Sequence, residues 1–323
     1  MSSRRGSDVA TLVAQARDGV PRAVARLLSM VEDAGPALRE VAAALAPHTG
    51  RAYVVGLTGS PGVGKSTSTN ALVGTLRARG RRVGVLAVDP SSPFSGGALL
   101  GDRVRMEQHA TDPGVFIRSM ASRGHLGGLS WGTPQAIRVL DGAGCDVILV
   151  ETVGVGQAEI EIASLADTTI VLLAPGMGDG IQAAKAGILE VADVYVVNKA
   201  DRDGAESTVR DLKGMLGLAG AYGDADRWRP PIVKTVAARN EGVDEVLAAV
   251  DAHRAWLERT DRLRARRRDR AAREVEAIAV ATLRARIGDL HGGETLVALA
   301  DQVATGKQDP FTAAETLLAE TTD

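Results

Sequence analysis

The sequence predicts an α/β fold, in which a mainly parallel sheet is covered by helices and flanked by helical segments at both ends. Two observations predict it. Short runs of β-branched residues alternate with helical stretches between about Tyr53 and Leu257. Most residues of these runs are apolar, as in strands that are buried on both faces of a parallel sheet. The expected strands are residues 53–57, 83–88, 115–118, 147–150, 168–174, 194–197 and 232–236.

The two ends of the chain show helical periodicity alone. Apolar residues recur at helical spacing between residues 8 and 46, and again after Trp256, where no strand pattern returns. Asp309 followed by Pro310 predicts the start of a last helix. The expected parts are an N-terminal helical segment, residues 1–48, a central domain, residues 49–258, and a C-terminal helical segment, residues 259–323.

Composition narrows the classes of function. The chain of 323 residues has a formal net charge of −2 and only 3% aromatic residues, which argues against nucleic acid as a partner. Cys145 is the only cysteine, so the sequence predicts neither an internal disulfide nor a thiol cluster for a metal ion. No run has the apolar length of a signal-peptide core or a membrane span. We expect a cytoplasmic protein without a membrane partner.

The segment GSPGVGKS, residues 59–66, matches the pattern of a phosphate-binding loop. It directly follows the first expected strand and precedes a helical run, which is the context that this pattern requires. Glycines let backbone N–H groups turn towards phosphate, and the N-terminus of the following helix favours negative charge. Lys65 is expected to contact the outer phosphates and the Ser66 hydroxyl to bind Mg²⁺. The expected nucleotide contacts here are Gly59, Ser60, Gly62, Val63, Gly64, Lys65, Ser66 and Thr67.

The segment NKAD, residues 198–201, directly follows another expected strand, where an open α/β sheet carries its ligand loops. The Asp201 carboxylate can accept hydrogen bonds from the N1–H and 2-amino groups of guanine. Adenine offers neither donor, so it would leave a buried charge unpaired. The segment therefore predicts that the nucleotide is GTP or GDP.

Acidic residues follow two further strands. Asp89 follows the strand 83–88 and opens the stretch DPSSPFSGGALLGDRVRM, which also contains Asp102. Glu151 ends the strand 147–150 and precedes Gly154, whose amide can respond to a γ-phosphate. Carboxylate and hydroxyl oxygens are ligands that Mg²⁺ prefers. The expected metal ligands are Ser66, Asp89, Asp102 and Glu151.

The residue after Gly154 predicts slow intrinsic hydrolysis. Val155 is apolar and cannot orient an attacking water, as a glutamine does in fast, partner-assisted GTPases. The sequence identifies no intramolecular arginine finger, although Arg105 and Arg118 are candidates.

Taken together, five segments resemble one family. They are GLTGSPGVGKST, VLAVDPSSPFSGGALLGDRVRM, FIRSMASRG, VETVGVGQAE and VVNKAD. The family is that of the GTPases associated with methylmalonyl-CoA mutase, the MeaB/ArgK group, which is related to the human protein of cobalamin type A methylmalonic aciduria. The resemblance runs from about residue 51 to residue 250 and continues more weakly into GKQDPFTAAETLL.

The resemblance implies a P-loop GTPase domain of the SIMIBI type in a homodimer, with GTP or GDP and Mg²⁺ as cofactors. It implies a chaperone of an adenosylcobalamin-dependent acyl-CoA mutase, with methylmalonyl-CoA mutase as the first candidate, that gates cofactor loading and reactivation. The C-terminal helices match the family's dimerisation arm. Which acyl-CoA mutase is the client stays open at this point.

Site residues carry over by position. Lys65, Asp89, Asp102 and Glu151 match the family's catalytic and Mg²⁺-binding residues, and Asn198, Lys199, Asp201 and the Ala237 amide match its guanine contacts. A switch loop that faces the mutase matches residues 178–185, with Asp179, Gln182 and Lys185 as its polar residues. The chain departs from the family at Gly180, and at Val236, where Ser is usual and Thr235 lies one position early.

Two other classes of function compete. A P-loop kinase of the amino-acid transport kinase type would need an acceptor pocket and a base, for which the stretch SRGHLGGLSWG offers His125 alone. A metal-delivery GTPase would need a ligand cluster, whereas the five histidines are scattered and one cysteine is present.

Overall fold

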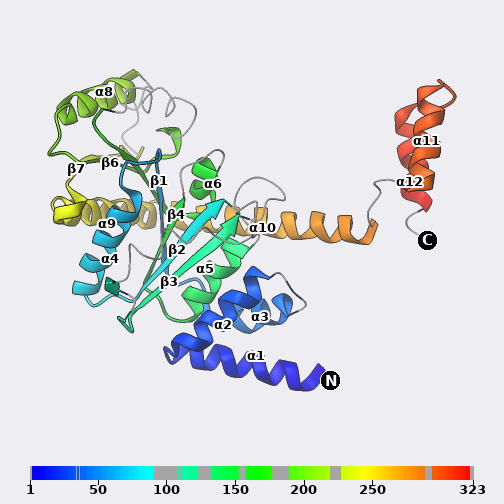
Figure 1. Cartoon of the computed structure of the whole chain (residues 1–323), viewed down its shortest axis with the longest axis horizontal. Helices are drawn as coiled ribbons and strands as arrows, with labels where there is room; N and C mark the ends of the chain where they lie inside the picture. The colour runs from blue at the N-terminus through cyan, green and yellow to red at the C-terminus, as the bar shows by residue number, and fades with distance from the viewer. Residues whose placement is uncertain are drawn as a thin grey trace. The chain divides into compact units, whose positions relative to one another are not determined.

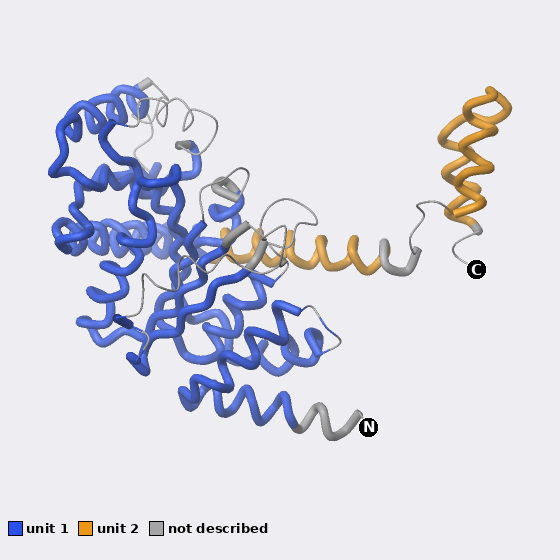
Figure 2. Tube along the Cα trace, in the orientation of Figure 1, with its two compact units in different colours: residues 1–263 blue, residues 264–323 orange. Residues whose placement is uncertain are grey.

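The computed structural model describes residues 2–33, 35, 37–90, 108–109, 111–122, 132–152, 158–176, 189–218, 227–287 and 293–320. The chain forms two compact units, residues 1–263 and residues 264–323 (Figure 2). No described helix combines the length and the apolar character that crossing a membrane requires.

The first unit is built on a seven-stranded sheet in the order β3-β2-β4-β1-β5-β6-β7 (Figure 1). All paired strands are parallel, as the apolar runs predicted. β2 continues through Asp89, which the sequence placed just beyond this strand. The strands are β1 (Tyr53–Thr58), β2 (Val83–Pro90), β3 (Val115–Ser122), β4 (Val147–Thr152), β5 (Thr168–Leu173), β6 (Val194–Asn198) and β7 (Ile232–Thr235).

Helices cover both faces of this sheet, because consecutive strand residues point to opposite faces and both sets are apolar. On one face, α4 (Lys65–Ala78) and α9 (Val243–Arg259) pack on a core that includes Val55 and Leu149. On the other face, α5 (Gly132–Gly142) packs on a core that includes Val54 and Ile148. The further helices of this unit are α6 (Ala158–Leu165), α8 (Ala205–Leu218), η1 (Ala46–His48), η3 (Leu189–Val191) and η4 (Ala237–Arg239).

The N-terminal helices extend the second of these cores. They are α1 (Ser2–Arg17), α2 (Pro21–Glu32) and α3 (Leu38–Leu45). Val13, Leu27 and Val41 are buried in the cluster that also holds Leu140 of α5. The helical segment at the N-terminus is therefore packed within the same compact unit as the sheet.

The second unit is helical, as the C-terminal periodicity predicted. It contains most of α10 (Arg262–Ile287), together with α11 (Glu294–Ala304) and α12 (Pro310–Glu320). The Asp309 carboxylate caps α12, because its Oδ1 accepts hydrogen bonds from the N–H groups of Phe311 at 2.9 Å and Thr312 at 3.1 Å. Several large apolar side chains of this unit are exposed, namely Val275, Ile278, Val280, Leu283, Val297, Phe311 and Leu318.

Candidate nucleotide-binding site

The loop of residues 59–66 joins β1 to α4 at the carboxyl edge of the sheet. Gly59, Gly62 and Gly64 have φ values of 143°, 81° and 95°, which residues other than glycine rarely adopt. A Cβ atom at Gly59 would collide with the Leu172 carbonyl of β5, and one at Gly64 would collide with the Asn198 side chain. The glycines therefore permit both the backbone conformation of the turn and the close approach of β5 and of Asn198.

Lys65, the first residue of α4, folds back over this loop. Its Nζ donates hydrogen bonds to the carbonyls of Gly59 at 2.7 Å and Ser60 at 3.2 Å, and the residue is buried. The ammonium group thus lies inside the loop that the sequence assigns to the phosphates. Val63 is buried in the core between α4 and the sheet, whereas Thr67 is exposed.

Glu151, in β4, is bonded to two hydroxyls of α4. Its Oε1 accepts from the Ser66 hydroxyl at 2.7 Å, and its Oε2 lies 2.8 Å from the Thr69 hydroxyl. Glu151 is only 3% exposed, so these are charge-assisted hydrogen bonds in a buried setting. The sequence prediction of a shared Ser66 and Glu151 site did not include Thr69. The spacing of Thr69 from Ser66 could have predicted this contact, because residues three apart lie on the same face of a helix.

Asn198, at the end of β6, joins three segments that are far apart in the sequence. Its Nδ2 donates to the carbonyl of Val63 at 2.9 Å. Its Oδ1 accepts from the Thr235 hydroxyl at 3.1 Å and from the Ala237 N–H at 3.1 Å. The Thr235 hydroxyl is thus bonded to Asn198, and so is the Ala237 amide, which the sequence predicts to face guanine.

Lys199 and Asp201 follow Asn198 in the loop that the sequence assigns to the base. Lys199 has a φ of 58° and donates from Nζ to the Gly62 carbonyl at 2.6 Å, so it also supports the phosphate loop. The Asp201 carboxylate lies 3.8 Å from the Arg239 guanidinium, and both side chains are substantially exposed. An exposed pair at this distance contributes about 0–1 kcal/mol, so it is a weak competitor for a guanine base.

The structure describes only some of the remaining predicted site residues. The Asp89 backbone pairs with Ala121 of β3 at the carboxyl end of β2, beside the end of β4. Asp102, Gly154, Asp179, Gln182 and Lys185 lie outside the described residues. Arg118, a candidate arginine finger, is in the middle of β3 and bonded to Glu32 and Ser29 of α2.

The donors present fit a magnesium ion chemically. The Ser66 hydroxyl and the Glu151 carboxylate are hard oxygen donors 2.7 Å apart, at the N-terminus of α4. Within the described part of the chain, no group of three or more His, Cys, Asp or Glu side chains has a metal-binding arrangement. The metal-delivery hypothesis therefore gains no support from these residues.

A parallel sheet with a phosphate loop at its carboxyl edge, supported by an N-K-x-D segment, defines a P-loop protein of the GTPase class. Residues 24–290 match the model of a family described as Methylmalonyl Co-A mutase-associated GTPase MeaB. The chain therefore belongs to the MeaB family, whose members are GTPases that act on GTP.

Individual relatives agree with this assignment. A putative GTPase from Pyrococcus abyssi is 46% identical over 96% of this chain and 95% of its own. The Caenorhabditis elegans protein named methylmalonic aciduria type A homolog, mitochondrial, is 34% identical over 82% of this chain and 67% of its own. A crystal structure of an LAO/AO transport system kinase superposes with a TM-score of 0.72, at 27% identity over 98% of both chains.

Proposed function

We propose that this GTPase acts as a chaperone of an adenosylcobalamin-dependent acyl-CoA mutase, with methylmalonyl-CoA mutase as the first candidate, gating cofactor loading and reactivation. The observation that carries the proposal is the family match over residues 24–290, which includes the whole sheet and both nucleotide loops. The name of the Caenorhabditis elegans relative supports the same client. A cytoplasmic location remains a prediction from the sequence.

The phosphate loop and β4 suggest how nucleotide state can be communicated. Glu151 bonds directly to Ser66 and Thr69 of α4, and the chain continues from β4 towards Gly154. In the proposal, the Gly154 amide responds to the γ-phosphate, and GTP and GDP therefore favour different states of the following segment. The segment with Asp179, Gln182 and Lys185 would present that difference to the mutase.

The proposed chemistry uses few side chains. Lys65 would stabilise negative charge on the outer phosphates, while Ser66 and Glu151, with Asp89 and Asp102, would hold Mg²⁺. Bound Mg²⁺ would supply charge neutralisation of the phosphates. Because Val155 offers no polar group to orient water, the isolated protein hydrolyses GTP slowly and the mutase accelerates it.

A homodimer through the second unit is part of the proposal. Val275 and Leu283 of α10 are 66% and 56% exposed, and exposed apolar side chains at helical spacing favour a partner. The double variant Val275→Glu, Leu283→Glu is expected to convert the dimer to a monomer in light scattering coupled to size-exclusion chromatography. A variant that remains dimeric would place the interface elsewhere.

The decisive experiment is GTP turnover by the purified protein, alone and with an adenosylcobalamin-dependent acyl-CoA mutase from the same organism. We expect slow, GTP-specific hydrolysis that the mutase accelerates, and no phosphate release by the Lys65→Ala control. Hydrolysis of ATP at the same rate, or a GTP turnover that no such mutase changes, would contradict the proposed chaperone function. The kinase alternative, which the name of the superposed structure suggests, predicts instead a phosphorylated acceptor.

A further inference from the structure

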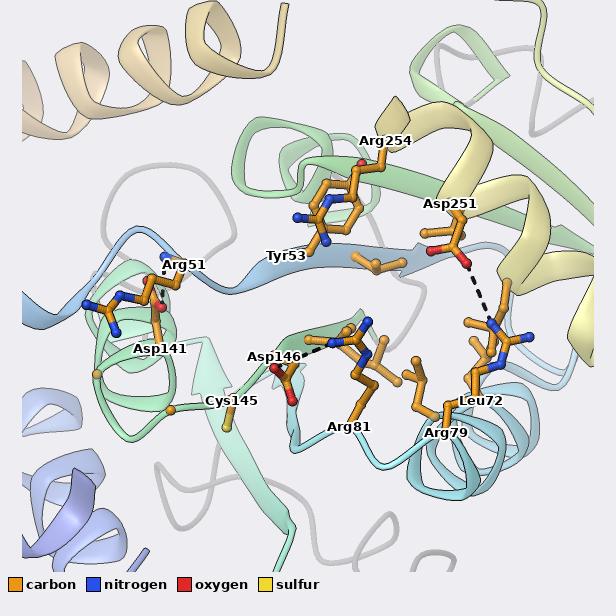
Figure 3. A pocket seen from close by; sticks show the side chains of 18 of the residues that line it. Arg51, Tyr53, Leu72, Arg79, Arg81, Asp141, Cys145, Asp146, Asp251 and Arg254 are labelled. Atoms are coloured by element: carbon orange, nitrogen blue, oxygen red, sulfur yellow. Dashed lines mark hydrogen bonds and ion pairs between the residues drawn. The ribbon is translucent and has the colours of Figure 1, made fainter. Parts of the chain in front are cut away.

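A cavity of about 670 Å³ lies at the edge of the sheet opposite the nucleotide loops (Figure 3). It is lined by residues near the amino ends of strands, such as Tyr53 of β1 and Val147 of β4. α4 and α9 contribute further walls, for example through Leu76 and Val250. None of the residues predicted to bind nucleotide lines this cavity, so it is separate from the GTP site.

The floor of the cavity is apolar. The aliphatic residues that line it belong to the core between the sheet, α4 and α9. Tyr53 adds an aromatic ring, whose hydroxyl is 2.6 Å from that of Thr168 and is therefore already satisfied. The aliphatic lining residues are Val55, Leu72, Leu76, Val147, Leu149, Ile170, Leu247 and Val250.

Two arginines approach this floor from different elements. Arg254 of α9 lies over the Tyr53 ring, 5.0 Å from its centroid, and Arg81 extends from the turn that precedes β2 (Figure 3). Arg81 is 3.9 Å from Asp146, and Arg254 is 2.8 Å from Glu258, in pairs that are about half exposed. Such surface pairs contribute about 0–1 kcal/mol, so an incoming anion can replace them at little cost.

The acidic residues of the wall are largely engaged. Asp141 accepts backbone hydrogen bonds from Arg51 at 3.2 Å and Ala52 at 2.9 Å. Asp251 pairs with Arg79 at 3.5 Å. In all, five arginines and four aspartates line the cavity, so its lining keeps a net positive charge of one when His48 is neutral.

We propose that this cavity binds a small organic anion, with an apolar or aromatic body on the floor and a carboxylate, sulfonate or phosphate between Arg81 and Arg254. Its volume falls within the range of about 300–1,000 Å³ found for small-molecule sites. Guanidinium groups form charge-assisted hydrogen bonds with such anions, which are about twice as strong as neutral ones. The site is independent of the proposed chaperone function.

The test uses 8-anilinonaphthalene-1-sulfonate, an aromatic sulfonate whose fluorescence rises on binding. We expect saturable binding that excess GDP leaves unchanged. The double variant Arg81→Gln, Arg254→Gln should weaken it about tenfold or more, since two charge-assisted hydrogen bonds are lost. Arg259→Gln, in the same helix but outside the cavity lining, is the matched control and should bind like the wild type.

A second pair of variants tests the shape. Val250→Phe should fill the floor and abolish binding, whereas Ala248→Phe introduces the same side chain at an exposed position of α9 and should not. Retained GDP binding shows that each variant is folded. If Val250→Phe does not bind GDP, the comparison of the Arg81→Gln, Arg254→Gln variant with Arg259→Gln tests the proposal on its own.

Competitors distinguish the charged group and its source. Displacement by 1-naphthoate or 1-naphthyl phosphate, and not by the neutral 1-naphthalenemethanol, would support an anion site and rank carboxylate against phosphate. Displacement by GDP, equal displacement by the neutral alcohol, or binding that ignores the arginine variants would each overturn the proposal.

Discussion

Replacing Thr69 by Val tests whether the hydrogen bond from α4 to the buried Glu151 stabilises the protein. The Thr69 hydroxyl lies 2.8 Å from Glu151 Oε2 and 3.1 Å from the Lys65 carbonyl. Valine keeps the shape of threonine and removes both contacts. α4 offers a matched control in Thr75, whose hydroxyl donates only to the Ala71 carbonyl four residues earlier, at 3.1 Å. Both threonines are buried, at 0% and 8% exposure.

The expected magnitudes differ because one hydrogen bond goes to a charged group. Loss of the local bond in Thr75→Val should cost about 0.5–1 kcal/mol of unfolding free energy. The single hydroxyl proton of Thr69 is shared with a buried carboxylate, and its loss in Thr69→Val should cost about 1.5–3 kcal/mol in all, because hydrogen bonds to charged groups are stronger. Ser66 still donates to Glu151, so we expect the lower part of this range. The two variants should therefore differ by about 1 kcal/mol, or roughly fivefold in the unfolding constant.

The assay is urea unfolding without nucleotide, followed by the fluorescence of Trp131, Trp228 and Trp256, all of which belong to the first unit. Thr69→Ser, which keeps the hydroxyl, should recover most of the difference between Thr69→Val and wild type. Equal destabilisation by Thr69→Val and Thr75→Val would refute the reasoning, since it would mean that the Glu151 contact contributes nothing measurable. A displaced Glu151 should also lower kcat/KM for GTP in Thr69→Val alone.

Three further predictions concern other parts of the first unit. Asn198→Ala should cost about 3 kcal/mol in urea unfolding, because three hydrogen bonds are lost, and a cost below about 1 kcal/mol would contradict their role. Burial raises the pKa of Cys145 to about 12, so this single thiol should resist Ellman's reagent at pH 8 until urea is added, although it lines the cavity, and rapid native labelling would show that the reagent reaches it through the cavity. The Arg77 guanidinium lowers the pKa of Asp112, so their ion pair stabilises above the unfolded pKa of about 3.9 and is lost as the pH falls through the folded value. Arg77→Gln should therefore lower the free energy of unfolding at pH 6, and its difference from the wild type should become smaller in acid. A difference that does not change with pH would mean that the loss comes from packing and not from the ion pair.

The sheet was largely predictable from local sequence. Each expected strand is present in the structure, because burial on both faces of the sheet favours mostly apolar runs that are visible in one short window. The ends of strands were less predictable. β3 was expected to end at Arg118 and continues to Ser122, since backbone pairing with β2 holds polar residues that periodicity alone does not recognise.

The contacts within the site were less predictable than its motifs. The position of Glu151 followed from the strand before it, whereas its bond to Thr69 depends on how α4 packs across β4. Thr235 seemed one position early for a base contact, and the structure instead pairs its hydroxyl with Asn198. In both cases the partners are separated by many residues, so the register of distant elements decides the contact.

The same long-range contacts give the phosphate loop a physical explanation that its motif lacks. Glycines permit the turn, but they do not choose which way each peptide unit faces. In the structure, Lys65 bonds the carbonyls of residues 59 and 60, Lys199 that of Gly62, and Asn198 that of Val63. Because a planar peptide holds each carbonyl opposite the next N–H, fixing these carbonyls also fixes the directions of the amides that would face phosphate. Asn198 and Lys199, identified by their resemblance to guanine contacts, therefore also position the phosphate loop, and changes at either residue should weaken the binding of any nucleotide rather than of guanine alone.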